Sequence, residues 1–353
     1  MRKGIGNIHE VVQIYNTLLK TPKTDASYED LKSSLYRNLL KLPNKTHPAV
    51  QQYQDKPYVV KTLNVKKDFG SHKPIEFSEI TRLLNLMRTD QLGNTCGHKS
   101  YFFMGGLAEL EEALIKYTVS SLLKKNFKFV SVPDILPRNI LESCGMTVNS
   151  DRTQIYSLDP NHHGPDLFLS GTAEMSLAGL IANTIYKYTD LPLKFAAVSR
   201  CYRAETSNLI EERGIYRVHQ FTKVEMFSVS APEQSDDMLE YLRETQEELF
   251  SNLGFHMQVL DMPPHELGAP AYRWVKSMFH LMHFCHMFIH MDMKFTKKNS
   301  QKLNGIAVNL EVYIALLNVA CYHGDAIPSP IVIKEVLAQE IMKILCGNRQ
   351  QQH

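Results

Sequence analysis

The sequence predicts an α+β fold in which helices flank a largely antiparallel sheet. Three observations predict it. Residues 106–125 are strongly amphipathic at helical spacing, and residues 232–254 form a second helical segment. Between them, residues 193–202 and 214–229 have the composition of long strands and are separated by a charged, polar loop. Because they are joined in this way, we expect the two strands to pair antiparallel. A shorter strand is expected at residues 127–132, directly after the first helix.

The N-terminal part is predicted to be a smaller helical unit, residues 1–75, in front of a main domain at 76–353. Apolar residues recur at helical spacing in residues 8–19 and again in 31–40, with a break at residues 21–25. Residues 45–75 are polar and contain three prolines, which is typical of a linker with short extended pieces. The unit carries 13 Lys and Arg against 6 Asp and Glu, a net charge of +7. Such a basic segment suits phosphate contacts, although a solvated helical face has the same composition.

Composition places limits on the class of protein. The chain has 353 residues, of which 44% are hydrophobic and 22% charged, and a net charge of only +2. These values are ordinary for a globular protein with a sizeable core. No run of 18 apolar residues is present, so we expect no membrane span. We also expect no targeting leader, because the basic start is not followed by an Arg- and Ser-rich amphipathic segment. The scattered cysteines indicate reduced thiols rather than a disulfide framework: Cys96, Cys144, Cys201, Cys285, Cys321 and Cys346.

The segment with the most chemical information runs from Arg203 to Glu225, across the loop between the two predicted strands. It contains arginines, whose planar forks bind phosphates in pairs of hydrogen bonds, and a phenylalanine able to stack on a base. Carboxylates lie beside them and could bind an amine. A surface hairpin of ion pairs has the same residue types, so the residues alone leave both interpretations open.

The order of these residues resembles motif 2 of class II aminoacyl-tRNA synthetases in its seryl-tRNA synthetase form. In that form, Arg-x-Glu opens a loop that closes on Arg-Gly and continues as Arg-x-His-Gln-Phe-x-Lys-x-Glu, as residues 203–225 do here. Four further segments resemble the same family in the same order. They are the Leu-Pro-Asn-x-x-His-Pro junction at 42–48, motif 1 at 106–133, Gly-Thr-Ala-Glu at 171–174, and a mitochondrial-type strand and turn at 261–272.

The resemblance implies a class II synthetase fold with a shortened N-terminal helical arm. It also implies an ATP site. Arg203 is the expected catalytic residue, binding the α-phosphate and the substrate carboxylate by electrostatic stabilisation. Glu205 is expected to contact the adenine amino group and Phe221 to stack on adenine, with Arg213 on the outer phosphates and Val218 among the ATP-binding positions. Mg²⁺ would accompany ATP, as hard cations bind phosphate oxygens.

The same resemblance implies a serine site and a reaction. Thr172, Glu174 and Glu225 are expected to bind serine, with a carboxylate paired to its ammonium group. The family converts serine and ATP to seryl-adenylate and then transfers the seryl group to tRNA-Ser. A homodimer, or a heterodimer with a related synthetase, is expected through residues 106–125. The mitochondrial-type motifs imply the mitochondrial matrix.

The sequence departs from the family after Arg273. The Gly-Arg-Gly turn and the Ser- and Asn-rich stretch are replaced by residues 274–298, where His280, His283, Cys285, His286 and His290 are present. Helical spacing would place several of these on one face and make a zinc site conceivable, but a divergent segment without metal is the favoured interpretation.

Two functional alternatives therefore stay open. Residues 303–307 resemble the start of motif 3, but Val312 occupies the position of an ATP-binding arginine, which predicts weaker ATP binding. The chain is either a serine–tRNA ligase or an inactive paralogue that binds a partner synthetase or RNA. In the second alternative, the chain would resemble the seryl-tRNA-synthetase-like protein of insect mitochondria. The complete motif 2 favours the first alternative, and Val312 favours the second.

Overall fold

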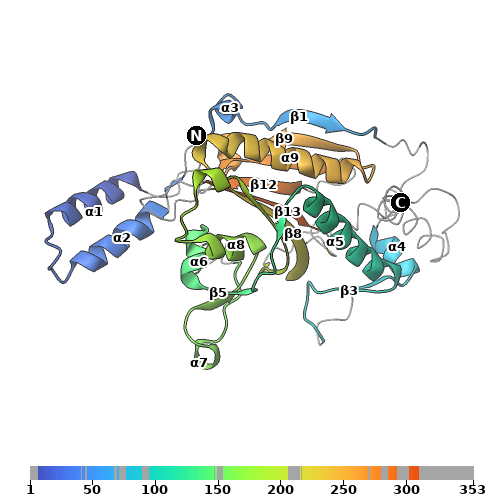
Figure 1. The fold of residues 1–353 in the computed structure, drawn as a ribbon. Coiled ribbons are helices and arrows are strands. Elements are labelled where there is room, and N and C mark those ends of the chain that lie inside the picture. The colour runs from blue at the N-terminus through green and yellow to red at the C-terminus, as the bar shows by residue number, and fades with distance from the viewer. Residues whose placement is uncertain are drawn as a thin grey trace.

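The computed structural model describes most of the chain up to residue 309. Described are residues 7–40, 42–43, 46–66, 70, 77–89, 95–146, 148, 154–205, 215, 217–268, 271–279, 285–291 and 302–309, with the backbone alone from 276 onward. Its centre is a nine-stranded sheet (Figure 1). The strand order is β1-β9-β11-β12-β13-β8-β7-β4, and β10 pairs with β12. All described pairs in it are antiparallel except β4 with β7.

The strands of this sheet are β1 (Tyr58–Leu63), β4 (Lys128–Phe129), β7 (Leu193–Tyr202), β8 (Gln220–Ser230), β9 (Met257–Asp261), β10 (Ala271–Arg273), β11 (Val275–Phe279), β12 (Cys285–Met291) and β13 (Lys302–Asn309). Two small sheets pair β2 (Met87–Arg88) with β3 (Phe102–Phe103) and β5 (Ile135–Pro137) with β6 (Leu167–Leu169).

Helices cover both faces of the large sheet, and the first two helices extend away from it. The helices are α1 (Ile8–Lys20), α2 (Tyr28–Leu40), α3 (Pro48–Gln51), α4 (Phe77–Leu83), α5 (Gly106–Lys124), α6 (Arg138–Ser143), α7 (Pro160–His163), α8 (Ala173–Ile181) and α9 (Ser235–Ser251). Single 3-10 turns lie at Tyr188–Asp190, Pro232–Gln234 and Pro264–Glu266. The helices α5 and α9 pack on one face of the sheet, and α6 and α8 pack on the other.

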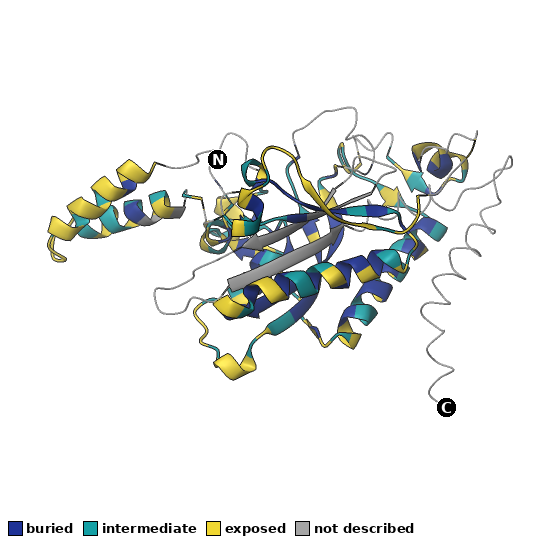
Figure 2. Cartoon of the chain, turned by 90° about the horizontal axis from the view of Figure 1, so that it is seen from above, coloured by how far each residue is buried: buried dark blue, intermediate teal, exposed yellow. Residues whose placement is uncertain are grey.

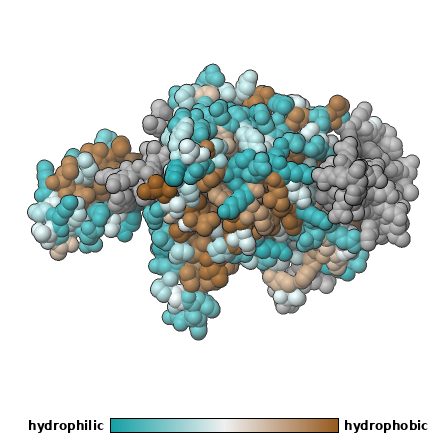
Figure 3. Space-filling view, in the orientation of Figure 1, coloured by the Kyte–Doolittle hydropathy of each residue, from teal (hydrophilic) through white to brown (hydrophobic). Residues whose placement is uncertain are grey.

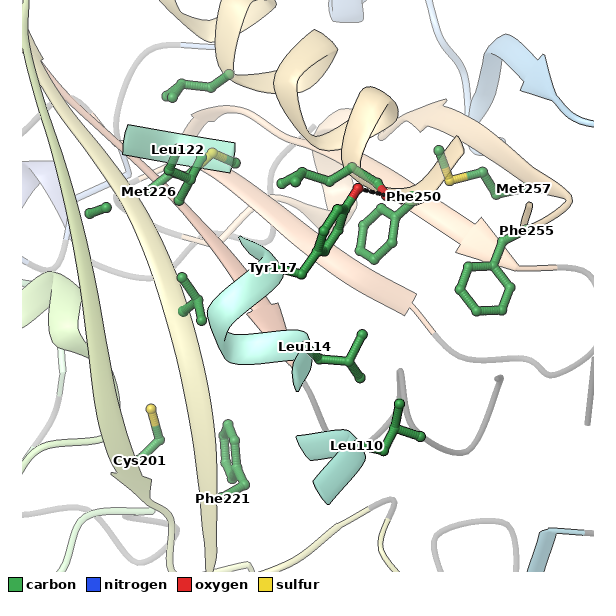
Figure 4. Packing of buried hydrophobic residues seen from close by; sticks show 14 of the residues in the cluster. Leu110, Leu114, Tyr117, Leu122, Cys201, Phe221, Met226, Phe250, Phe255 and Met257 are labelled. Atoms are coloured by element: carbon green, nitrogen blue, oxygen red, sulfur yellow. Dashed lines mark hydrogen bonds between the residues drawn. The ribbon is translucent and has the colours of Figure 1, made fainter. Parts of the chain in front are cut away.

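Two apolar clusters hold these layers together, one on each face of the sheet. One strand contributes to both clusters, because successive residues of a strand point to opposite faces. Val224 and Met226 of β8 face α5 and α9, whereas Phe227 and Val229 face α6 and α8. The residues that α5 contributes to the first cluster recur at helical spacing (Figure 4). The hydroxyl of Tyr117 in this helix donates to the carbonyl oxygen of Leu249 over 3.1 Å, so its polar end is satisfied inside the core.

The helical hairpin α1–α2 extends away from the sheet (Figure 1). Its own small core includes Val11 and Leu35, which are 5% and 8% exposed. A row of apolar side chains on α1 remains exposed. Apolar surface is visible on the arm in Figure 3, and many residues of the arm are coloured as exposed in Figure 2. The row consists of Ile8, Val12, Tyr15 and Leu19.

The structure confirms the class II α+β fold that the sequence predicts, and its main elements match closely. The helices expected at 106–125 and 232–254 are α5 and α9, and the strand expected at 193–202 is β7. Two strands are shorter than predicted. The expected 127–132 strand is reduced to β4, where the Val130 amide still donates to the Ala196 carbonyl before Pro133 ends the pairing. The strand β8 begins at Gln220 rather than at 214.

The segment after Arg273 contains strands of the main sheet. β11 pairs with β9, and β12 lies between β11 and β13. The helical spacing considered for Cys285, His286 and His290 is therefore wrong, because β12 is extended and paired on both sides. His280, His283 and Val312 lie outside the described residues.

The linker before residue 75 also contacts the sheet. The strand β1 pairs with β9, and the His47 amide donates to the Tyr272 carbonyl over 3.0 Å. The boundary near residue 75 stays a prediction. None of the helices in the described ranges is long and apolar enough to cross a membrane.

Candidate active site

The candidate site is built on the two longest strands of the sheet, β7 and β8. Phe221, Lys223 and Glu225 are alternate residues of β8 and therefore share one face of it. Phe227 continues this series and packs against α8, which identifies the face. The Phe221 ring, at the start of the strand, also belongs to the apolar cluster that includes α5. The N-terminus of α8 lies over these residues, because the hydroxyl of Thr172 reaches Glu225. The sheet and one helix thus bring residues 172–174 to residues 221–225.

A closed triad of polar side chains lies where α8 begins. The Thr172 hydroxyl donates to Glu225 Oε2 over 2.8 Å, and the Lys223 ammonium group donates to Thr172 Oγ1 over 2.5 Å. The same ammonium group lies 2.9 Å from Glu225 Oε2. The Lys223 and Glu225 side chains are only 5% and 1% exposed, so this pair is buried. Thr172 also accepts the Glu174 amide over 3.3 Å as the N-cap of α8, which connects the triad to the start of the helix.

Glu174 adds a second carboxyl group to this cluster. Burial, together with the negative charge of Glu225, raises the pKa of Glu174 to about 8, and the Lys223 charge opposes this shift. Two carboxylates that face one lysine do not both ionise easily in a dry site. A second cation, such as the ammonium group of an amino acid, would stabilise the ionised form of Glu174.

Arg203 lies just beyond the end of β7, on the same side. Its guanidinium carbon is 5.2 Å from the centre of the Phe221 ring, a cation–π contact. The Arg203 amide donates to the His219 carbonyl over 2.9 Å, which fixes the backbone where the two strands separate. Phe221 is 5% exposed. The guanidinium group and the aromatic face are therefore neighbours, as a site for a phosphate beside a flat base requires.

Glu205 is held in place by residues from three other segments. Its Oε2 accepts from Arg217 and from Gln154, each over 3.1 Å, and its carbonyl oxygen accepts from Lys99 over 3.0 Å. The Ala204 amide also donates to the Gln154 carbonyl over 2.9 Å. With 8% of its surface exposed, Glu205 has a fixed position at the entrance to the hairpin loop.

Comparison with known proteins decides the family. Residues 156–304 match the family model described as the tRNA synthetase class II core domain (G, H, P, S and T). The mitochondrial serine–tRNA ligase of Mus musculus is 42% identical over 246 residues, which are 69% of this chain and 47% of that protein. The chain belongs to the seryl-tRNA synthetase family. It spans about half the length of the mammalian mitochondrial relatives that it matches, 47% in the mouse and bovine proteins.

Solved structures of this family share the fold. The cytoplasmic serine–tRNA ligase of Naegleria fowleri in complex with AMP aligns with a TM-score of 0.77 at 18% identity, covering 89% of this chain and 71% of that one. The seryl-tRNA synthetase of Pyrococcus horikoshii complexed with ATP aligns with a TM-score of 0.73 at 23% identity, covering 88% and 82%. The sheet and its flanking helices are therefore a class II synthetase core.

The structure gathers most of the residues that the seryl-tRNA synthetase motifs predict. Thr172 contacts Glu225, and Arg203 contacts Phe221. Val218 is 4% exposed and, like Phe221, belongs to the apolar cluster beside α5. Arg213 lies outside the described residues.

Three residues in contact with this site were assigned no role from the sequence. Lys223 carried a usable signal, since it lies two residues before Glu225 in a predicted strand and therefore on the same face. Lys99 and Gln154 had no such signal. They reach Glu205 from segments about 106 and 51 residues away in the chain, which no local pattern reveals.

Proposed function

We propose that this chain is a serine–tRNA ligase of mitochondrial translation. It would convert serine and ATP to seryl-adenylate and pyrophosphate. It would then transfer the seryl group to the terminal ribose of tRNA-Ser, with release of AMP. The observation that carries the proposal is the proximity of two contacts on one face of β8. The Thr172–Glu225 contact suits an ammonium group, and the Arg203–Phe221 contact, four residues away along β8, suits a phosphate beside a base.

The proposed chemistry depends on fixed charges rather than on a covalent enzyme intermediate. Arg203 would bind the α-phosphate and the carboxylate of serine, where negative charge concentrates as the two react. Thr172, Glu174 and Glu225 would hold the amino acid through its ammonium group. Glu205 would recognise the adenine amino group, a role that its fixed carboxylate suits.

The ATP site would extend beyond these residues. Phe221 would stack on adenine, with Val218 behind it in the core and Arg213 on the outer phosphates. Mg²⁺ accompanies ATP in the proposed reaction. Within the described ranges, no three His, Cys, Asp or Glu side chains converge as a metal site would require.

The proposal extends to assembly and location. We expect a dimer through α5, either a homodimer or a heterodimer with a related synthetase, which light scattering at micromolar concentration would detect. The hairpin α1–α2 and linker, residues 1–75, would contact tRNA-Ser, and residues 76–353 would form the catalytic-type domain. The mitochondrial matrix is supported by the names of relatives from Mus musculus, Bos taurus and Saccharomyces cerevisiae, each a mitochondrial serine–tRNA ligase.

A second candidate function is supported by Val312. This residue occupies the sequence position of the ATP-binding arginine of motif 3, and the loss of such a charge weakens nucleotide binding. In this alternative the chain is an inactive paralogue that binds a partner synthetase or RNA.

Serine-dependent exchange between ATP and pyrophosphate distinguishes the two functions. The wild-type protein should catalyse exchange, and Arg203→Ala should lower the rate by about 100-fold or more, because a fixed charge is lost where charge develops. Arg200→Ala is the matched control, since Arg200 is an exposed arginine on β7, three residues before Arg203. A folded, dimeric protein without exchange would favour the second function, and recovery of a synthetase or RNA in pull-downs would then support it.

A further inference from the structure

The buried ammonium group of Lys223 is the feature of this site to which the family motifs assign no role. It lies 2.5 Å from Thr172 Oγ1 and 2.9 Å from Glu225 Oε2, with 5% of the side chain exposed. A lysine is costly to bury, and it is retained only where its charge has partners. Here both partners are residues expected to bind the amino acid.

The hydrogen bonds of Lys223 determine how the Thr172 hydroxyl is oriented. An ammonium group donates and cannot accept, so Thr172 Oγ1 must accept from Lys223. Thr172 also accepts from the Glu174 amide over 3.3 Å. Both lone pairs are then in use, and the single hydroxyl proton is directed at Glu225 Oε2 over 2.8 Å. Lys223 therefore sets the proton position of Thr172.

The same contacts orient the Glu225 carboxylate. The contacts that it makes with Thr172 and Lys223 both fall on Oε2. This leaves Oε1 as the oxygen to which a substrate cation would bind. A carboxylate anchored at one oxygen by two donors cannot rotate freely, so the other oxygen keeps a fixed direction.

Lys223 also controls the charge of the cluster. The titratable groups around it are the carboxyls of Glu225 and Glu174 and the thiol of Cys201, whose pKa it affects together with Arg203. With Glu225 ionised, the Lys223 charge neutralises it and limits the repulsion that Glu174 experiences. Without Lys223, two carboxyl groups would face each other with no cation between them, and Glu174 would stay protonated and unable to pair with an ammonium group.

We propose that Lys223 is a positioning residue of the amino-acid site, which orients Thr172 and Glu225 and keeps the carboxyl pair able to receive a substrate ammonium group. This proposal rests on the proposed function for its substrate. The effects of Lys223 on the orientation of Thr172 and Glu225 and on the charge of Glu174 do not depend on catalysis.

The first experiment therefore uses no substrate. Carbon-13 NMR of glutamate side chains, with Glu174 assigned from Glu174→Gln, follows its titration in wild-type protein, Lys223→Met and Lys223→Arg. Removing a cation at this distance should raise the pKa of Glu174 by about one unit or more. Lys223→Arg keeps the charge and should stay near the wild-type titration. An unchanged titration in a folded Lys223→Met protein overturns the proposal.

The second experiment separates substrate affinities. In the exchange assay, Lys223→Met should raise the KM for serine by about tenfold or more, the effect of a lost charge-assisted contact of about 1.4 kcal/mol. The KM for ATP should stay within about twofold, and Lys223→Arg should restore part of the serine affinity. Equal effects on both KM values would indicate a general structural role and overturn the proposal.

Two further outcomes are also decisive. If wild-type protein shows no exchange, the proposed function fails, and the titration of Glu174 alone decides the role of Lys223. If Lys223→Met does not fold, nitrogen-15 NMR of the Lys223 ammonium group in wild-type protein replaces it. The chemical shift of that nitrogen should change over the pH range in which Glu174 titrates. A chemical shift that does not change there contradicts the proposal.

Discussion

At the scale of single residues, Thr172 links the local structure of a helix to the chemistry of the site. Its hydroxyl caps α8 and donates to Glu225, so in the proposed function one oxygen atom would contribute both to folding and to substrate binding. Its backbone is also fixed, because the Ser170 hydroxyl donates to the Thr172 carbonyl over 2.6 Å. A change of this residue should therefore affect stability and serine affinity together.

Thr172→Ala should lower the free energy of unfolding by about 1 kcal/mol, the usual effect of losing an N-cap oxygen. It should also raise the KM for serine in the exchange assay, because Glu225 loses one of the donors that orient it. Urea denaturation measures the first effect. Thr172→Ser keeps the hydroxyl and is the matched control, and a serine variant as impaired as the alanine variant would refute the capping argument.

Glu174 gives stability a dependence on pH. Its pKa is about 8 in the folded protein and near 4.5 in an unfolded chain. Between these values the unfolded chain releases a proton that the folded protein retains, so stability falls as pH rises through this window, by at most about 1.4 kcal/mol per pH unit. Below the lower value the two states bind the proton equally, and above the upper value the loss is complete.

Glu174→Gln should remove this dependence. The stability of the variant relative to wild type should therefore increase as pH rises from about 5 to about 8. Denaturation curves at three pH values would measure it, with Glu142→Gln, whose side chain is 44% exposed, as control. A constant difference between Glu174→Gln and wild type across this range would show that Glu174 is ionised in the folded protein.

At the scale of elements, a chain of ion pairs ties β9, β10 and α9 together. Arg273 on β10 donates to Asp261 Oδ2 on β9 from Nε and Nη2, over 3.0 and 2.8 Å, and to Glu240 Oε1 on α9 over 2.9 Å. Glu240 also accepts from Arg243 over 2.6 Å. Asp261 is fully buried, and burial raises its pKa while Arg273 opposes the shift.

Arg273→Met should destabilise the protein by about 3–5 kcal/mol at neutral pH, because it leaves a buried carboxylate without its cation. Protonation of Asp261 relieves this cost, so the loss should be smaller at pH 5 than at pH 7.5. Arg138→Met is the control, since Arg138 pairs with a more exposed partner, Asp166, and such pairs contribute about 1 kcal/mol or less. Equal losses in both variants would contradict the assignment.

The elements also show what sequence patterns predict and where they stop. Helical spacing predicted α5, because this helix buries one face against the core, and the strand-like composition of residues 193–202 before a charged loop predicted β7. The placement of β11 and β12 depends on pairing with β9 and β13, which are distant in the chain, so local spacing was misleading. In the site, the residues of β8 were predictable from one motif. Lys99 and Gln154 were not, because only the folded chain brings their loops to Glu205.

At the scale of the whole molecule, the hairpin α1–α2 and the sheet are separate parts of the structure. The hairpin extends from the body and has its own small core around Val11 and Leu35 (Figure 1). Among the described residues, by contrast, those that form the candidate site all lie at or after Lys99. Residues 1–75 carry 13 basic and 6 acidic residues, so the net positive charge of the chain is concentrated at this end. In the proposed function, serine activation and tRNA binding should therefore depend on different parts of the molecule.

A variant that lacks residues 1–41 tests this division. It should keep the exchange rate of the full chain to within about twofold, because no residue of the site is removed. Transfer of serine to tRNA-Ser should fall, and its KM for tRNA should become less sensitive to salt, since fewer cations then contact phosphates. The matched control replaces two lysines of the hairpin, Lys20 and Lys32, by glutamine, which keeps the fold and should weaken only the tRNA step. Loss of exchange in the truncated protein would instead mean that the hairpin supports the catalytic body, and an unchanged KM for tRNA would remove the hairpin from tRNA recognition.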